Sequence, residues 1–439
     1  MRLTPAQVLA LGFAAVILTG SVLLMLPWTR APGKITPYID ALFTSTSAVC
    51  VTGLVTVDTG SHWSVPGQLI ILLLIQVGGL GIMTVSTAFA FLMGKRISLR
   101  ERLLIQEATG LTQIAGLVRL TRAILIATLI IEGAGAVLLA SRFTFDMAPG
   151  RAVYFGIFHA ISAFCNAGFD LFGRSFMTYV GDWFVNLVVT SLILIGGIGF
   201  SVVTELYSTK LGRRGRLSLH SRLALKVTAA LLVLGTVLIF AFEYRNPATL
   251  SPLPPHAKFL ASYFHSVTPR TAGFNTLPTG KMTIPGLLLT IVLMFIGASP
   301  GGTGGGIKTT TFATILATVW AIMSGKQDVE IGDRRLTRDV VDRSLAITFI
   351  SLGLVVLVTT LLTITENALF IEILFEATSA FGTVGLSTGL TPSLSTLGKA
   401  FVIIMMFAGR VGPLTLAVAI AQRVHAGQVR LPEDKVLVG

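Results

Sequence analysis

The sequence predicts an all-α polytopic membrane protein, in which eight transmembrane helices and four re-entrant pore loops are arranged with fourfold pseudo-symmetry. Hydrophobic residues make up 53% of the 439 residues and charged residues only 12%, and the mean hydropathy is +0.82. A soluble domain carries about 25% charged residues, so this chain is expected to lie in a lipid bilayer. Long apolar stretches and a fourfold internal repeat are the other two observations that predict this fold.

Eight mostly apolar stretches reach the length of about 20 residues that a spanning helix needs. They form four pairs and run approximately over residues 6–27, 66–93, 117–141, 181–206, 222–243, 283–323, 343–365 and 397–422. A shorter, half-polar stretch separates the members of each pair, at 38–50, 151–165, 257–268 and 369–380. A helix of about 12 residues is only about 18 Å long. Each short stretch is therefore expected to enter a hydrocarbon core about 30 Å thick without crossing it.

Four glycines mark the internal repeat, because they recur roughly every 110 residues and each follows one of the short stretches. These filter glycines are Gly53, Gly168, Gly273 and Gly385. They predict four repeats, at residues 1–94, 95–210, 211–325 and 326–439. Each repeat is expected to contain a long helix, a half-length helix, an extended segment and a second long helix.

The extended segments are expected to surround a pathway for cations. Non-helical backbone survives at membrane depth only where it is buried in protein or lines water, so four such segments imply a shared aqueous passage. Backbone carbonyls can replace the water around a cation, and glycine permits the positive φ that turns successive carbonyls the same way. The half-length helices also direct the negative ends of their dipoles toward the centre.

Carbonyl oxygens, rather than carboxylates, are the predicted ligands of the transported ion, and this favours a monovalent cation over calcium. The predicted filter residues are Cys50, Val51, Thr52, Gly53, Cys165, Asn166, Ala167, Gly168, Arg270, Thr271, Ala272, Gly273, Gly382, Thr383, Val384 and Gly385. None of them is acidic.

Four motifs carry a resemblance to a known family. They are DALFTSTSAVCVTGL from Asp40, FHAISAFCNAGF from Phe158, TPRTAGFN from Thr268 and FEATSAFGTVGL from Phe375. With them the chain resembles, over nearly its whole length, the membrane subunits of the bacterial Ktr potassium uptake systems in the Trk/Ktr/HKT superfamily. The resemblance implies that each repeat is a helix–pore-loop–helix unit like a potassium-channel subunit.

The same resemblance implies the substrate, the partners and the location. Potassium is the expected substrate and sodium the expected activator, with no covalent cofactor. Two copies are expected to form a homodimer with one pore in each protomer, on a cytosolic ring of nucleotide-binding regulatory subunits. The expected location is the bacterial cell (inner) membrane, with the lipid bilayer around the chain. A nucleic-acid partner is not expected, because the basic residues lie between apolar spans and do not form one face.

The filter segments depart from those of a strict potassium channel, which has two glycines in each subunit. Only the fourth repeat keeps both, at Gly382 and Gly385, whereas Cys50, Cys165 and Arg270 stand at or near the earlier place in the others. Fewer ordered rings of carbonyls predict weaker discrimination between potassium and sodium.

A glycine-rich interruption in the second helix of the third repeat is the predicted gate. Six glycines and a proline between residues 297 and 306 cannot hold a helix, although apolar residues flank them. The resemblance implies an intramembrane loop here that blocks the pore from the cytoplasmic side. The expected gating residues are Gly297, Gly301, Gly302, Gly304, Gly305, Gly306, Lys308 and Arg410. The segment GGTGGGIKT is not a phosphate-binding loop, because its lysine does not directly follow the last glycine.

Two charged residues lie in apolar surroundings at membrane depth. Arg410 is expected to face the pore or a partner, because a charge at the bilayer centre costs at least about 2.5 kcal/mol. It is either a positive barrier to cations, as the resemblance implies, or a lock between helices. Glu132 is either a proton-coupling carboxylate or the partner of a basic or backbone group.

Further polar groups and glycines are given structural roles. We expect Glu376, His159 and His265 to pack or cap, and Asp40 and Glu372 to concentrate cations at the outer mouth. The glycines of the second helices in the first two repeats are expected to permit close helix packing, and they are Gly78, Gly79, Gly81, Gly196, Gly197 and Gly199.

Orientation follows from the basic residues, which concentrate in the predicted cytoplasmic segments such as 95–122 and 210–226. The positive-inside rule then places both termini in the cytoplasm. Two other functional classes are weighed against a channel-like protein. A secondary active symporter, coupling sodium or protons to a solute, also fits broken helices, but carriers typically have inverted halves. An enzyme is not expected, because neither paired carboxylates nor a metal cluster lies at membrane depth.

Overall fold

The computed structural model describes residues 4–81, 117–210 and 216–415, and within these ranges nearly all regular structure is helical. The first repeat contains α1 (Pro5–Leu24), α2 (Tyr38–Val49), α3 (Thr59–His62) and α4 (Val65–Leu80). The second contains α7 (Leu117–Phe143), α8 (Pro149–Phe164), α9 (Trp183–Ile198) and α10 (Phe200–Lys210). The third contains α11 (Leu219–Glu243), α12 (Pro255–Val267), α13 (Ile284–Phe295) and α14 (Thr309–Met323).

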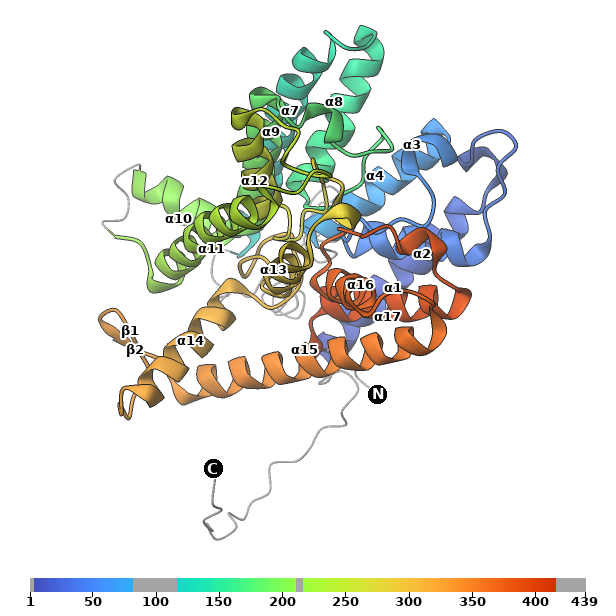
Figure 1. The fold of residues 1–439 in the computed structure, drawn as a ribbon. Helices are drawn as coiled ribbons and strands as arrows, with labels where there is room; N and C mark the ends of the chain where they lie inside the picture. The colour runs from blue at the N-terminus through green and yellow to red at the C-terminus, as the bar shows by residue number, and fades with distance from the viewer. Residues whose placement is uncertain (1–3, 82–116, 211–215, 416–439) are drawn as a thin grey trace.

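The fourth repeat begins with a short antiparallel hairpin of β1 (Glu330–Ile331) and β2 (Arg334–Arg335). It continues with α15 (Arg338–Thr365), α16 (Phe370–Gly382) and α17 (Thr396–Val411). The repeats lie in sequence order around a common centre, from blue through green and gold to red (Figure 1). The half-length helices α2, α8, α12 and α16 occupy the places that the sequence predicted.

The first helix of every repeat can cross a membrane. By length and composition, four helices of the described residues do so: Ala6–Leu24, Arg122–Phe143, Leu219–Glu243 and Arg338–Thr365. Large apolar side chains on these helices, such as Leu129, Val237 and Phe349, are exposed on the outer surface of the chain. The second helices are shorter or bent within the described residues. Parts of two predicted spans, residues 82–93 and 416–422, lie outside the described residues, so the count of eight spans stays a prediction.

A second helix ends earlier than the sequence predicted in more than one repeat. The interruption in the third repeat is confirmed, since α13 ends at Phe295 and α14 begins at Thr309. In the other repeats α4, α9 and α17 each end at a glycine with positive φ, at Gly81 (+82°), Gly199 (+101°) and Gly412 (+94°). A helix cannot continue through such a residue. After Gly199 the chain turns by 98° into α10.

Close packing is the role of other glycines in these helices. A methyl group at Gly78 would collide with the carbonyl oxygen of Val49, and one at Gly196 with that of Phe164. The ends of the half-length helices therefore lie directly against the second helices, as expected for these two glycines. Gly81 and Gly199 have the different role of ending a helix, which the sequence interpretation missed.

Packing between repeats follows one rule around the whole molecule. The second helix of each repeat contacts the half-length helix of the next, in the pairs α4 with α8, α9 with α12, α13 with α16 and α17 with α2. The last pair joins the fourth repeat to the first. The four repeats therefore form a closed ring, which places the ends of the four half-length helices around its centre.

A buried ion pair joins the fourth and first repeats. Lys399 on α17 lies 2.7 Å from Asp40 on α2, and the two side chains are only 14% and 9% exposed. Asp40→Ala would leave the lysine buried without its partner and is expected to lower the free energy of unfolding by about 3 kcal/mol. Replacing both residues, as Asp40→Leu with Lys399→Met, should cost much less. Denaturant unfolding in detergent micelles measures both, and equal losses would contradict this assignment.

Candidate functional site

Each of the four extended segments alternates between left-handed and ordinary backbone. In the first repeat Val51 (+55°) and Gly53 (+93°) have positive φ and Thr52 between them does not. The same alternation occurs at Asn166 and Gly168, Thr271 and Gly273, and Thr383 and Gly385. This alternation turns the carbonyls of neighbouring residues toward the same side. Holding a non-glycine residue in the left-handed region costs about 1–3 kcal/mol.

The filter glycines of neighbouring repeats contact one another around the centre. A methyl group on any of them would lie within 3.0 Å of a carbonyl oxygen from the adjacent repeat. These pairs are Gly53 with Ala167, Gly168 with Ala272, Gly273 with Val384 and Gly385 with Thr52. The contacts pass from the first repeat to the fourth and return to the first. Four segments far apart in the sequence therefore close one ring, which only glycine can complete.

A hydroxyl at the end of each half-length helix fixes the extended segment. Ser47 accepts a hydrogen bond from the amide of Gly53 at 3.0 Å, and Ser379 accepts one from Gly385 at 3.2 Å. Ser162 and Thr268 instead donate to the carbonyls that follow the glycine, those of Phe169 and Phe274. The sequence analysis missed these residues, although Ser47, Ser162 and Ser379 stand in the recurring motif SA[VF].

The earlier filter positions differ from the sequence interpretation. Cys50 and Cys165 are the C-caps of α2 and α8, and Gly382 is the last residue of α16. The guanidinium of Arg270 points to α11, where it donates to Thr228 at 3.1 Å. The left-handed residues that precede the filter glycines are the next ones along the chain, Val51, Asn166, Thr271 and Thr383, so no repeat has glycine at that place.

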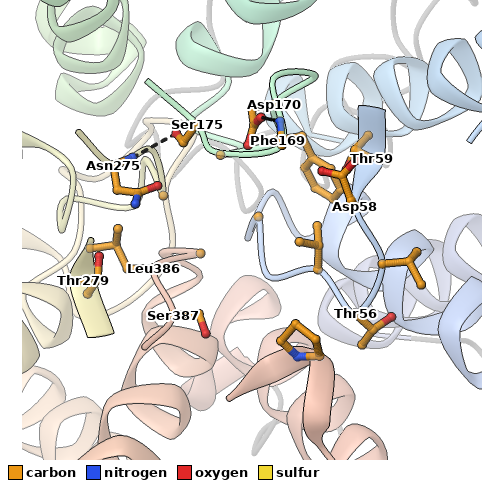
Figure 2. Close-up of a pocket in the computed structure, with 18 residues that line it drawn as sticks. Thr56, Asp58, Thr59, Phe169, Asp170, Ser175, Asn275, Thr279, Leu386 and Ser387 are labelled. Atoms are coloured by element: carbon orange, nitrogen blue, oxygen red, sulfur yellow. Dashed lines mark hydrogen bonds between the residues drawn. The ribbon is translucent and has the colours of Figure 1, made fainter. Parts of the chain in front are cut away.

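On one face of the ring lies a cavity of about 350 Å³, which we call the outer cavity. All four filter glycines line it. Asp58, in the first repeat, and Asp170, in the second, stand at one side of it, and Ser387 and Asn275 stand at other points of its wall (Figure 2). Asp40 and Glu372 do not line this cavity. The first is paired with Lys399, and the second accepts a hydrogen bond from the amide of Leu369 at the start of α16. The expected acids of the outer mouth are thus replaced by two that the sequence analysis missed.

Asp170 is expected to make cation uptake sensitive to pH. Burial, aided by the charge of nearby Asp58, raises the pKa of Asp170 to about 6, although the amide of Gly173 opposes this rise. The carboxyl group is therefore charged above about pH 6 and neutral below it. Asp170→Asn should raise the half-saturating cation concentration about threefold at neutral pH, because a negative cleft concentrates cations. Wild-type protein at about pH 5 should match the variant, and Asp333→Asn in the β1–β2 turn is the control. A difference that persists at low pH would contradict this reading.

On the opposite face of the ring, residues 297–308 form a largely buried loop against the third and fourth filter segments. The amide of Gly305 donates to the hydroxyl of Thr383 at 3.1 Å, and a methyl group at Gly304 would collide with the hydroxyl of Thr271. The loop also bonds to the break in α9, from Ser299 and Thr303 to the carbonyls of Gly197 and Gly196. Gly301 and Gly306 have positive φ, and Gly297 lies against the backbone of Gly305 and Gly306.

Arg410 is bonded to this loop from α17, and Lys308, the last residue of the loop, bonds back to it. The guanidinium of Arg410 donates to the carbonyls of Thr303 in the loop and Gly78 in α4. The ammonium of Lys308 donates to the carbonyl of Gly304 at 2.6 Å. Both residues line an inner cavity of about 340 Å³, together with Gly301, Gly302, Gly304 and Gly306. The arrangement brings together all the predicted gating residues except Gly297 and Gly305 at the wall of this cavity.

Comparison with known proteins identifies the family of this chain. The sequence profile of the TrkH family, described as a cation transport protein, matches residues 5–429. This chain belongs to the TrkH family of cation transport proteins. It is 44% identical to Ktr system potassium uptake protein B of Bacillus subtilis, over the whole chain and 98% of that protein. It is 40% identical to potassium/sodium uptake protein NtpJ of Enterococcus hirae, over the same shares of each chain.

A solved structure shares the fold of this TrkH-family chain. The potassium transporter TrkH from Vibrio parahaemolyticus superposes with a TM-score of 0.74, over 94% of this chain and 83% of that one. The two sequences are only 18% identical, so the likeness concerns the fold alone.

Glu132 in this TrkH-family chain has polar partners. Its carboxylate accepts a hydrogen bond from the amide of Gln76 at 3.1 Å and lies 3.7 Å from the Sγ of Cys165. These groups join α7, α4 and the end of α8 behind the second filter segment. The pairing favours the structural interpretation of Glu132, with side-chain partners rather than the basic or backbone group expected. Among the described residues, no group of three His, Cys, Asp or Glu side chains could hold a metal ion.

Proposed function

We propose that this chain carries potassium ions into the cell through the passage enclosed by its four filter segments. The observation that supports this most directly is the ring of filter glycines, which brings the carbonyls of Thr52, Ala167, Ala272 and Val384 into equivalent positions. Carbonyl oxygens replace the hydration shell of potassium. The two relatives named above are potassium and potassium/sodium uptake proteins.

In this proposal the ion passes the outer cavity, then the filter, and then the gate. Asp58 and Asp170 attract it into the outer cavity, where it still has water around it. It then exchanges that water for carbonyl oxygens of the filter residues, while the C-terminal ends of four half-length helices face it with their negative dipoles. Because no repeat has two filter glycines, we expect weaker discrimination against sodium than in a strict potassium channel.

Residues 297–308 and Arg410 form the proposed gate. The loop lies directly below Thr271 and Thr383, and Arg410 ties it to α4 by two backbone hydrogen bonds. A cation leaving the filter meets both this loop and the positive charges of Arg410 and Lys308. Opening therefore requires the arginine to release Thr303 or Gly78, so that the loop can move aside.

Sodium dependence, a homodimer and a cytosolic nucleotide-binding regulatory subunit complete the proposal. The similarity to a Ktr system B protein, whose name implies a further component, supports the regulatory subunit, and the similarity to a potassium/sodium uptake protein supports the sodium dependence. The homodimer is implied by the resemblance of the sequence motifs alone. In this proposal the chain lies in the cell membrane with both termini in the cytoplasm, as the distribution of its basic residues predicts. A secondary active symporter is the second candidate, because the broken second helices resemble those of carriers. The parallel order of the repeats around one ring argues against it.

Uptake of rubidium by liposomes that contain the purified chain tests the function. We expect rubidium to enter down its own gradient, to be blocked by potassium, and to enter faster when sodium is added. Uptake that stops without a sodium or proton gradient would favour the symporter. Liposomes that stay impermeable to rubidium with and without sodium, and with the regulatory subunit present, would contradict the proposal.

A further inference from the structure

The half-length helix of the fourth repeat carries a buried carboxylate that holds the chain just beyond the filter. Glu376, on α16, is fully buried and lies nine residues before Gly385. Its carboxylate accepts hydrogen bonds from the amide of Thr388 at 3.2 Å, from the hydroxyl of Thr391 at 2.8 Å, and from the hydroxyl of Ser387. The expected role of packing or capping is therefore made specific by these contacts. Glu376 fixes the loop that leaves the fourth filter segment.

His159 makes the same connection in the second repeat. It lies on α8, also nine residues before its filter glycine, and is fully buried. Its Nδ1 is 2.7 Å from the carbonyl oxygen of Phe155. Because a carbonyl can only accept a hydrogen bond, Nδ1 carries the proton and donates it. Nε2 is then free to accept the amide of Leu171 at 3.3 Å. Leu171 follows Gly168 by three residues, as Thr388 follows Gly385.

The first and third repeats lack this connection among the described residues. Thr44 stands nine residues before Gly53, and its buried hydroxyl has no hydrogen-bond partner. His265 stands eight residues before Gly273 and is paired with Thr290 on α13, 3.1 Å away. The hydroxyls of Thr56 and Thr276, three residues after these glycines, are also buried without a partner.

The two repeats that have this connection lie opposite each other in the ring. Because each repeat contacts the next around the ring, the second and fourth lie opposite each other, as do the first and third. We propose that Glu376 and His159 are positioning residues that clamp the outer ends of two opposite filter segments from their own half-length helices. The first segment has no such clamp among the described residues, and the third is held instead by hydrogen bonds between Asn275 and the second repeat. The clamps then set how tightly potassium is held and how well sodium is rejected. This inference rests on the proposed function.

Two replacements of Glu376 separate its geometry from its charge. Glu376→Gln keeps one oxygen for Ser387 and Thr388, and its amide group can donate to the hydroxyl of Thr391. Glu376→Ala removes all three bonds and leaves buried donors unpaired. If the clamp acts by position, the glutamine variant should behave like wild type and the alanine variant should not. If the carboxylate acts by attracting cations, both variants should lose affinity.

The matched controls are a carboxylate and a hydroxyl that make no clamp. Glu366 accepts hydrogen bonds from the amide of Ser395 at 3.0 Å and from its hydroxyl at 2.5 Å, and so joins α15 to α17 away from the filter. Glu366→Ala therefore removes a similar capping interaction. Thr44→Ala changes the residue that corresponds to Glu376 in the first repeat.

Rubidium uptake by liposomes, measured over a range of rubidium and competing sodium concentrations, tests the clamps. For Glu376→Ala and His159→Leu we expect KM for rubidium to rise about tenfold and sodium to compete about tenfold better, with the maximal rate largely kept. Glu376→Gln and Thr44→Ala should stay within about twofold of wild type. Glu366→Ala should lower only the amount of folded, active protein.

The outcomes decide between the inference and simpler roles. Glu376→Ala with wild-type KM and sodium competition would overturn the inference, as would a glutamine variant as impaired as the alanine variant. If Glu376→Ala does not accumulate as folded protein, His159→Leu and Ser387→Ala carry the same test, since each removes part of one clamp. Failure of the wild-type chain to take up rubidium would instead contradict the proposed function.

Discussion

Gly385→Ala is expected to reduce rubidium uptake by a hundredfold or more while the protein remains folded. Gly385 has φ of +89°, where an L side chain costs about 1–2 kcal/mol. Its added methyl group would also collide with the carbonyl oxygen of Thr52, which is one of the proposed potassium ligands. The ring would have to open at the junction of the fourth and first repeats. A hundredfold loss of rate corresponds to a barrier raised by about 2.7 kcal/mol.

Gly389→Ala is the matched control for this prediction. Gly389 has φ of +108° and lies in the same loop, but a methyl group there would meet no atom within 4 Å. The control therefore carries the backbone strain without the collision. Uptake should fall much less than for Gly385→Ala. Equal losses in the two variants would show that backbone strain alone, and not closure of the ring, explains the requirement for glycine.

Arg410→Ala is expected to raise the rate of rubidium entry by about tenfold, which corresponds to a barrier lowered by about 1.4 kcal/mol. The replacement removes a positive charge from the wall of the inner cavity and frees the carbonyls of Thr303 and Gly78. Both effects favour an open passage. The measurement is rubidium uptake without the regulatory subunit, at equal amounts of folded protein.

The comparison with lysine separates the two effects of Arg410. Arg410→Lys keeps the charge but can place only one ammonium between two carbonyls. If the charge is the barrier, the lysine variant should remain slow, and if the two hydrogen bonds hold the gate, it should be nearly as fast as the alanine variant. An alanine variant that is folded but no faster than wild type would indicate that Arg410 is a lock between helices and not a gate.

The parts of the fold that could be predicted are those marked by a pattern within a short stretch of the sequence. The half-length helices were found because each is too short to span and ends near a recurring glycine. The ends of α4 and α9 were missed, because Gly81 and Gly199 lie in apolar runs beside other glycines whose presence close helix packing already explains. Only the positive φ at these residues reveals that the helix stops.

The missed parts of the site depend on contacts between distant segments. Asp58 and Asp170 reach one cavity only because the first and second repeats are neighbours in the ring. The sequence predicts a packing or capping role for Glu376 but does not identify its partners, because Ser387, Thr388 and Thr391 follow the turn of the filter and are not in its own helix. The filter glycines were found by their spacing, but the exact left-handed residue before each required backbone angles.

The central claim is that the carbonyls of four filter segments bind the transported cation on one axis. Diffraction from crystals soaked in thallium or rubidium tests it, because either ion scatters anomalously and substitutes for potassium. We expect peaks on the axis, coordinated by the carbonyls of Thr52, Ala167, Ala272 and Val384. Occupied sites only elsewhere in the protein, with none inside this ring, would contradict it.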